Sequence, residues 1–319
     1  MKAAVLVNPS AGGADGIGDV CRAIDHFLAG ADVCTATALG GGLIRASRPI
    51  EADANGYVPR LQACVDALAA REPDFYLVAG GDGFAAYVAD RLLRTGHARP
   101  RILGVAMGTA NVGPIIAFPA GNLVNASPET LAFSGCGAIE AFDGNVSVAH
   151  GFNDIVLGNT ILGTLDGKAQ TISARAMAMG GQKVPETPLK EIAGNLTVAK
   201  NGLRSPSALP HAAQIVVSAM ERENLYGRAV SGMLCFAGYQ QVRAALLVSE
   251  RPLVVTDYDP RGFAAPALFE QVMFGAGDEI TIEGLLPEAL IIADGNPYPR
   301  AFGPVSLRYR PDVIQTAKL

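Results

Sequence analysis

The chain of 319 residues lacks most of the short motifs that identify an enzyme class directly. It has no G-x-x-x-x-G-K-[ST] phosphate-binding loop, no H-E-x-x-H pair of metal ligands and no G-x-S-x-G turn for a serine nucleophile. Its five cysteines never form a C-x-x-C pair, and its four histidines (His26, His97, His150 and His211) are isolated. These absences exclude a P-loop enzyme and give no support to a zinc site, a disulfide framework or serine hydrolysis.

Charge and long apolar runs are also scarce. Only 17% of the residues are charged, and the net charge of -5 argues against a broad surface for nucleic acid or for anionic membranes. No apolar run approaches the roughly 18 residues that a membrane-spanning helix needs. The first apolar run ends at Asn8-Pro9, too early for a signal peptide. We therefore expect a cytoplasmic protein with no nucleic-acid partner and no membrane span.

The first part of the chain alternates strand-like and helix-like stretches. Strands are predicted at 2–7, 31–37, 74–79 and 101–106, and helices at 19–28, 57–70 and 84–93. This alternation predicts an α/β domain with a parallel sheet covered on both faces. The loops after Val7, Ala79 and Ala106 would then leave the sheet at its carboxyl edge, where ligands bind.

From about residue 136 the pattern changes to short strand-like pieces separated by Gly, Pro and Asp, with little helix. These pieces are predicted at 138–144, 195–200, 214–220, 231–238, 243–249, 252–257, 279–284 and 289–295. A mobile loop is expected at 177–188. The predicted organisation is an α/β nucleotide-phosphate-binding domain (1–135), a β-rich, sandwich-like acceptor-binding domain (136–300) and a C-terminal segment (301–319) that packs back on the first domain.

The stretch LVAGGDGFAA (77–86) places Asp82 between glycines, directly after an apolar strand. The aspartate can be a turn residue. It can also belong to a G-x-G-x-x-A dinucleotide fingerprint, but the next strand lacks the acidic residue which that motif requires. Third, Gly80, Gly81 and Gly83 can form an anion-binding concavity, in which a carboxylate would hold a Mg²⁺–phosphate or accept the proton of an attacking hydroxyl.

Other polar turns follow the strands in a definite order. They are NPSAGG (8–13), GVAMGTAN (104–111), GFNDIV (151–156) and IIADGNP (291–297). Each of them alone is explained by turn chemistry. Together with GGDG they form the series NP-x-x-GG, GGDG, G-x-x-x-GTAN, ND-x-V and a late DG, which extends over nearly the whole chain.

This series resembles the superfamily of NAD kinases and diacylglycerol or sphingosine-type lipid kinases. The resemblance implies an N-terminal α/β domain, a β-rich C-terminal domain, and ATP- and Mg²⁺-dependent phosphorylation of a hydroxyl in the cleft between them. It identifies Asp82 with the catalytic aspartate. It identifies as nucleotide-binding residues Asn8, Gly80, Gly81, Gly83, Thr109 and Asn111. Ser10 and Gly108, in the same polar turns, are expected to bind the nucleotide phosphates with them. The resemblance identifies as acceptor-binding residues Asn153, Asp154 and Asp294; the metal ligands stay unassigned.

The two branches of the superfamily match different parts of the chain. NPSAGG and GTAN are more like the lipid kinases, whereas ILGV (102–105) and FNDIV (152–156) are more like NAD kinases, including the divergent group associated with acetoin catabolism. TILGTLDG (160–167) is similar to that divergent group too. Phe84 stands where threonine is usual after GGDG, and Asn296 stands where lipid kinases usually have glutamate. The TPTGSTAY-like segment by which ordinary NAD kinases hold their dinucleotide has no copy here, since ARAMAMGGQ (174–182) does not match it.

Three functions remain open on this basis. The first is an ATP-dependent small-molecule kinase similar to NAD kinase, and the second is a kinase of lipids or other polyols. The third is a nucleotide-binding protein that has the fold and no catalysis, which Phe84 and the missing segment favour. The resemblance and the spare strand edges of the second domain also indicate a homo-oligomer.

Overall fold

The computed structural model describes residues 1–11, 16–45, 47–52, 54–107, 111, 113–165, 168–220, 242–256, 266–301 and 303–318. The chain divides into two compact units. Unit 1 consists of Met1–Cys136 and Asp312–Leu319, and unit 2 consists of Gly137–Pro311. Two long strands, β7 (Ala132–Asp143) and β20 (Val305–Lys318), contribute residues to both units.

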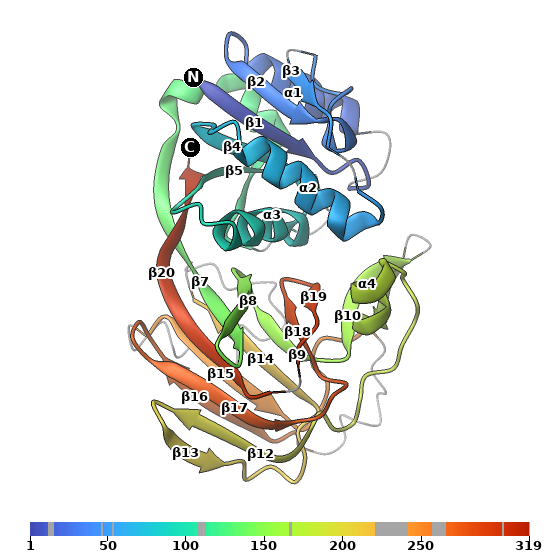
Figure 1. The fold of residues 1–319 in the computed structure, drawn as a ribbon, viewed down its shortest axis with the longest axis vertical. Helices are drawn as coiled ribbons and strands as arrows, with labels where there is room; N and C mark the ends of the chain where they lie inside the picture. The colour runs from blue at the N-terminus through green and yellow to red at the C-terminus, as the bar shows by residue number, and fades with distance from the viewer. Residues whose placement is uncertain are drawn as a thin grey trace. The chain divides into compact units, whose positions relative to one another are not determined.

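Unit 1 is an α/β structure built on a parallel sheet (Figure 1). Its strands are β1 (Lys2–Val7), β2 (Asp32–Ala36), β3 (Ser47–Ile50), β4 (Phe75–Gly80), β5 (Arg101–Ala106) and β6 (Ile116–Pro119). Its α-helices are α1 (Ile17–Phe27), α2 (Tyr57–Ala69) and α3 (Asp82–Arg94). The strand order is β5-β4-β1-β2-β3, with β6 beside β5, and each of these neighbouring pairs is parallel.

The apolar runs of the sequence explain this sheet. Every residue of β4 is buried, which is typical of a parallel strand covered on both faces. On one face, Val5 and Leu77 pack with Ile24 and Phe27 of α1 in a single cluster. Helix α3 packs along β4 and α2 packs against α3. Unit 1 therefore has the covered parallel sheet that the alternation of strands and helices predicts.

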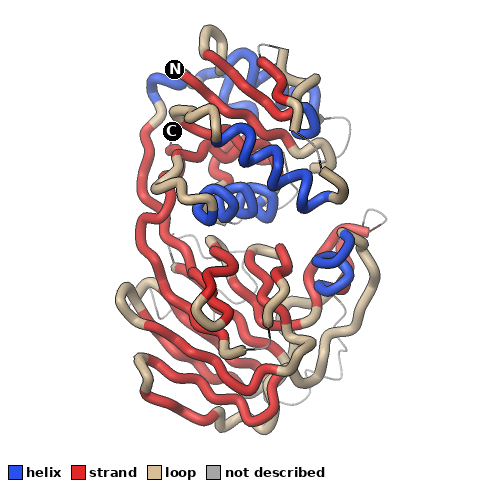
Figure 2. The backbone as a smooth tube through the Cα atoms, in the orientation of Figure 1, coloured by secondary structure: helices blue, strands red, loops and turns tan. Residues whose placement is uncertain are grey.

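Unit 2 is made mainly of strands (Figure 2), and its strand pairs are antiparallel. Besides parts of β7 and β20 it contains β8 (Val146–Gly151), β9 (Ile155–Gly158), β10 (Thr160–Leu165), β11 (Lys168–Ser173), β12 (Ala193–Lys200), β13 (Leu203–Pro206), β14 (Gln214–Ala219), β15 (Ala244–Ser249), β16 (Phe269–Phe274), β17 (Glu279–Leu285), β18 (Leu290–Ala293) and β19 (Asn296–Tyr298). A six-stranded antiparallel sheet runs in the order β16-β15-β14-β9-β18-β19. The predicted α/β class with a β-rich C-terminal part is confirmed.

The other strands of unit 2 form two further groups. In the first group β13, β12, β17 and β20 are neighbours, and β7 pairs with both β20 and β8. In the second, β10 and β11 form a hairpin, whose Ile161 and Ile172 pack in one cluster with Val156 and Val216 of the six-stranded sheet. Strand β20 pairs with β17 through residues 305–308 in unit 2, and with β5 through residues 315–316 in unit 1.

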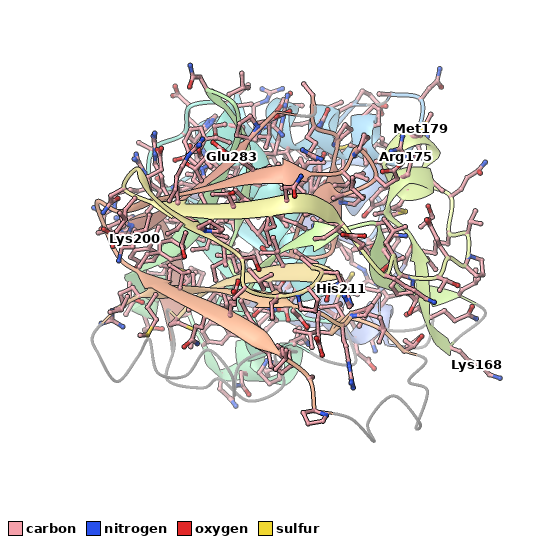
Figure 3. All side chains as sticks on the ribbon, turned by 90° about the horizontal axis from the view of Figure 1, so that it is seen from below. Lys168, Arg175, Met179, Lys200, His211 and Glu283 are labelled. Atoms are coloured by element: carbon pink, nitrogen blue, oxygen red, sulfur yellow. The ribbon has the colours of Figure 1, made fainter. Side chains whose placement is uncertain are left out.

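Two predictions about unit 2 need correction in the described residues, the first of them only for residues 177–180, because residues 181–188 contain no helix and no named strand. The expected loop at 177–188 begins inside a helix, α4 (Ala174–Gly180), which starts where the Ser173 hydroxyl accepts the Ala176 N–H and stops at Gly181 with a φ of 68°. Ala174 is buried, whereas Arg175 and Met179 are exposed on the outside of the helix (Figure 3). The short capped turn has too few residues for a clear apolar period.

The second error concerns the apolar segment 252–257, which forms no strand at residues 252–256. The reason is its backbone pairing. The N–H groups of Leu253 and Val254 donate to the side-chain oxygen of the buried Gln214, at 2.8 and 2.9 Å, instead of to a neighbouring strand. The predicted strand at 231–238 lies outside the described residues. Among the described helices, none is both long and apolar enough to cross a membrane.

Candidate functional site

In unit 1, the loops that follow β1 and β5 are joined to the end of β4. The N–H of Asn8 donates to the carbonyl of Ala79 at 2.9 Å, and the N–H of Met107 donates to the carbonyl of Gly80 at 2.9 Å. The three strands are parallel neighbours, so their carboxyl ends meet at one edge of the sheet. Asn8, Gly81 and Met107, which directly follow these three strands, therefore lie at the same edge.

Asp82 is the first residue of α3, and Gly81 is the N-cap of that helix. The Oδ2 atom of Asp82 accepts the N–H of Gly113 at 2.9 Å, across 31 residues of sequence. A Cβ added to Gly113 would lie 3.0 Å from Oδ1 of Asp82, so the carboxylate and the backbone at 113 are closely packed. Asp82 thus holds the loop after β5 against the start of α3.

Some of the neighbouring polar residues lie within the described part of the chain and some do not. The side-chain oxygen of Asn8 accepts the N–H of Ser10 at 3.0 Å, which closes the turn after β1. The side-chain oxygen of Asn111 is buried. Gly108 and Thr109, predicted to bind nucleotide, lie outside the described residues.

Phe84 has a packing role that the sequence does not reveal. Its side chain is buried in the first turn of α3. A Cβ added to Gly80 would lie 2.7 Å from Cδ1 of Phe84 and 3.4 Å from Cβ of Asn8. The ring therefore occupies the space beside Gly80 at the end of β4, and residue 80 has room for glycine only.

Unit 1 has features that fit a bound phosphate. Gly81 stands at the start of α3, where the helix dipole is positive, and a Cβ added there would meet no other atom within 4 Å. Among the described residues no group of three His, Cys, Asp or Glu side chains is arranged to hold a metal. Mg²⁺ in phosphoryl-transfer enzymes is commonly held by one or two carboxylates together with the substrate phosphates. Asp82 beside an open glycine turn fits that requirement.

In unit 2, the other predicted residues meet at a second cluster. The carboxylate of Asp294 accepts three successive backbone N–H groups, from Phe152 at 2.7 Å, Asn153 at 2.7 Å and Asp154 at 3.0 Å. In return, the N–H of Asp294 donates to the carbonyl of Asp154 at 3.0 Å. The structure thus brings Asp294 into contact with Asn153 and Asp154, which lie 141 and 140 residues earlier in the chain.

The strands explain how this cluster forms. Strands β9 and β18 are antiparallel, and Ile155 pairs with Ala293, so the residues just before β9 and just after β18 are adjacent. Asp294 and Gly295 both have positive φ, 49° and 78°, in the tight turn between β18 and β19. Aspartate tolerates this conformation better than most residues do. The turn directs the Asp294 carboxylate onto the amides of 152–154.

Burial of the Asp294 carboxyl and the nearby charge of Asp154 raise its pKa to about 7. The three amide donors act in the opposite direction. Two further contacts complete the cluster. The buried Ser218 hydroxyl donates to the carbonyl of Asn153 at 2.7 Å, and the Oδ1 atom of Asn153 is itself buried without a hydrogen-bond partner among the described residues.

Sequence reasoning missed two residues of these clusters. Gly113 and Ser218 contribute a backbone N–H and a hydroxyl to groups far away in the chain. A glycine in a Gly-rich loop and a serine inside an apolar strand carry no distinguishing signal. Only the folded structure identifies them.

Comparison with known proteins indicates the fold. No protein-family model matches the chain. A protein of Archaeoglobus fulgidus described as uncharacterized is 30% identical over 202 residues, which is 60% of this chain and 59% of that protein. The chain therefore spans about three fifths of the length of this relative. The crystal structure of yeast NADH kinase complexed with NADH is similar with a TM-score of 0.53 and 12% identity, over 100% of this chain and 83% of the kinase. The chain has the fold of NAD kinases, and the resemblance is confirmed at that level.

Proposed function

We propose, from the NAD kinase fold together with the Asp82 cluster, that this protein is an ATP-dependent kinase. It would transfer the γ-phosphoryl group of ATP to a hydroxyl of a dinucleotide such as NAD or NADH. The observation that carries the proposal is the position of Asp82. Its carboxylate begins α3 directly after the Gly80-Gly81 turn and is held by the N–H of Gly113 at 2.9 Å.

In unit 1 the residues have separate roles in this proposal. Gly80, Gly81 and Gly83 would bind phosphate oxygens through backbone N–H groups and the N-terminal end of α3, because glycine allows close approach. Asn8 and Ser10 would contribute polar donors from the turn after β1, and Gly108, Thr109 and Asn111 would do so from the loop after β5. Mg²⁺ bound with ATP would neutralise charge on the phosphates.

Asp82 would assist the chemical step. As the acceptor oxygen bonds to the γ-phosphorus and the bond to the ADP oxygen breaks, the Asp82 carboxylate would accept the proton of the acceptor hydroxyl. A carboxylate fixed by a backbone N–H needs little reorganisation for this step. The tether to Gly113 supports that role, because it restricts the side chain to one orientation.

In unit 2 the proposal assigns acceptor recognition to the loop at 152–154. The buried Oδ1 of Asn153 requires an N–H or O–H donor, and it has none among the described residues. A dinucleotide offers amino and hydroxyl donors of this kind. The yeast kinase of similar fold is an NADH kinase and was crystallised with NADH, which supports the same choice of acceptor.

The test is an acceptor screen with purified protein and Mg·ATP. We expect NADP or NADPH to form from NAD or NADH, and we expect Asp82→Asn to lower the rate of its formation by about 10²–10⁴-fold. Asp74→Asn is the matched control, because Asp74 also accepts one backbone N–H, from Lys2 at 2.7 Å, before the start of β4. ADP release only with diacylglycerol emulsions or polyols would replace the dinucleotide by a lipid-type acceptor. Tight ATP binding with no ADP from any acceptor would contradict catalysis.

Two further expectations accompany this proposal. Chelation of Mg²⁺ should stop ADP formation, because the metal is expected to enter with ATP. Assembly into a homo-oligomer stays a prediction, which light scattering of the purified protein tests directly.

A further inference from the structure

We propose that Asp294 is a positioning residue, whose carboxylate fixes the backbone of residues 152–154 so that Asn153 and Asp154 are held ready for the acceptor. In this view Asp294 does not touch the acceptor itself. The part that concerns the acceptor rests on the proposed function, whereas the part that concerns the backbone stands without it.

The hydrogen bonds of Asp294 carry the inference. A carboxylate offers about four lone-pair sites, and the protein fills three of those of Asp294 with consecutive amides. Both oxygens are used, since Oδ2 accepts from Phe152 and Oδ1 accepts from Asn153 and Asp154. The side chain is therefore committed to the protein's own backbone.

The backbone around the loop is constrained on both sides. Asn153 donates its N–H to Asp294 and accepts the Ser218 hydroxyl at its carbonyl, at 2.7 Å in each case. A Cβ added to Gly151 would lie 2.6 Å from the carbonyl oxygen of Asp154, so the loop folds back on itself without room for a larger residue. Such contacts fix the backbone of Asn153 and with it the direction of its Cα–Cβ bond.

The side chain of Asn153 is the group left for a ligand. The main-chain N–H and C=O of Asn153 are both paired, yet its buried Oδ1 has no partner among the described residues. A buried acceptor without a donor is costly unless a bound molecule supplies one. A rigid backbone that presents an unsatisfied acceptor is suited to binding, because little freedom is lost when the ligand arrives.

The conformation of Asp294 agrees with this role. Its φ of 49° lies in the left-handed region, which most residues other than glycine avoid. Glycine would satisfy the backbone of the turn equally well, but it would leave three amides of 152–154 without their acceptor. Aspartate meets both requirements at once.

The experiment compares three variants of the full chain. Asp294→Asn keeps the size of the side chain but replaces one acceptor oxygen with an NH₂ group that cannot accept an N–H. Ser218→Ala removes the other anchor of Asn153 and is the milder variant. Asp278→Asn is the matched control, because Asp278 lies in the turn before β17 of unit 2, where it accepts the Gly275 N–H at 3.0 Å and a side-chain N–H of Asn201 at 2.7 Å.

Two readouts are measured on each variant: hydrogen exchange of the amides of 152–154 in the ligand-free protein, and the KM values for NAD and for ATP. In Asp294→Asn we expect exchange at 152–154 to rise about tenfold or more, and the KM for NAD to rise by a similar factor. The KM for ATP should stay within about twofold of the wild-type value, because ATP is assigned to unit 1. Ser218→Ala should act in the same direction, and Asp278→Asn should change neither quantity.

Different results would overturn the inference. Wild-type protection at 152–154 in Asp294→Asn would show that the carboxylate does not hold the loop. A raised KM for NAD with unchanged protection would make Asp294 a direct contact to the acceptor. If the wild-type protein forms no NADP, the proposed function fails, and hydrogen exchange alone then decides whether Asp294 holds the loop.

Discussion

The contact between Gly80 and Phe84 allows a quantitative test of how the end of β4 is packed. Replacing Gly80 with alanine would place a Cβ 2.7 Å from Cδ1 and 3.3 Å from Cγ of the Phe84 ring. The backbone of Gly80 lies outside the left-handed region, so alanine causes no strain of its own there. The substitution therefore acts only by steric overlap, mainly with the side chain of Phe84.

The magnitude follows from those distances. The ring is buried and would have to move by a large part of an ångström to make room for the Cβ. Overpacking of this kind should destabilise the fold by about 1–3 kcal/mol. Replacing Phe84 with threonine, the residue that the kinase resemblance leads one to expect, removes the ring at a cost of about 3 kcal/mol. In the threonine background the Cδ1 atom at 2.7 Å is absent, and the Cγ position at 3.3 Å and the Cβ of Asn8 at 3.4 Å are the next contacts, so Gly80→Ala should then cost less than about 1 kcal/mol.

The double-mutant cycle should accordingly show a coupling of about 1–2 kcal/mol. Because the chain contains two compact units, a single melting temperature is a poor measure of stability in unit 1. Native-state hydrogen exchange of the segment 75–90 measures the local free energy of opening instead. If the free-energy costs of Gly80→Ala and Phe84→Thr add to the cost of the double variant within about 0.5 kcal/mol, the reasoning is refuted. The ring would then not be what excludes a side chain at Gly80.

Three further predictions concern other parts of the molecule. Asp82→Asn should lower the rate of phosphoryl transfer by about 10²–10⁴-fold in an initial-rate assay, and should leave the fold intact because the amide oxygen can still accept the Gly113 N–H. Gly104→Ala should destabilise unit 1 by more than about 2 kcal/mol in denaturant unfolding, because its Cβ would lie 2.3 Å from the carbonyl oxygen of Ile115. The stability of unit 2 should fall as the pH rises from about 4 to about 7, because Asp294 holds a proton in the folded state with a pKa raised to about 7, whereas the unfolded chain releases it near the model-peptide value.

Each of these has a clear opposite result. Full activity of Asp82→Asn would remove Asp82 from the chemical step, and a lower rate with a disordered loop after β5 would make its role structural. A stable Gly104→Ala would mean that β6 does not approach β5 as closely as the structure shows. Unfolding of Asp294→Asn provides the control for the pH effect, because this variant has no carboxyl at that position. An unchanged pH dependence in it would assign the effect to another group.

The regular elements of unit 1 were predictable because their signals are local. The apolar run within 2–7 and the helical spacing of Val58, Leu61, Val65 and Leu68 depend only on neighbouring residues, and β1 and α2 form there. The glycines after β4 also indicated where α3 begins, to within two residues. The prediction of a strand at 252–257 was wrong for the converse reason: what decides that segment is Gln214, a buried side chain about 40 residues earlier in the chain.

The functional residues divide in the same way. Order along the chain was sufficient to single out Asp82, Asn153 and Asp294 as a set worth testing. What each carboxylate contacts was not predictable, because Asp82 meets Gly113 across 31 residues and Asp294 meets Asn153 across 141. Those hydrogen bonds exist only after strands have paired, so no local pattern records them.

The sequence by itself determined which residue types stand at the ends of its strands, since periodicity and glycine turns act over a few residues. Tertiary structure decided which of those residues face one another. It gave Phe84 a steric role beside Gly80, and it directed the Asp294 carboxylate onto the amides of 152–154. The first outcome depends on how the turn after β4 places the start of α3 against that strand. The second depends on the pairing of β9 with β18, which are distant in the chain. Packing of either kind is settled only when the sheet has formed.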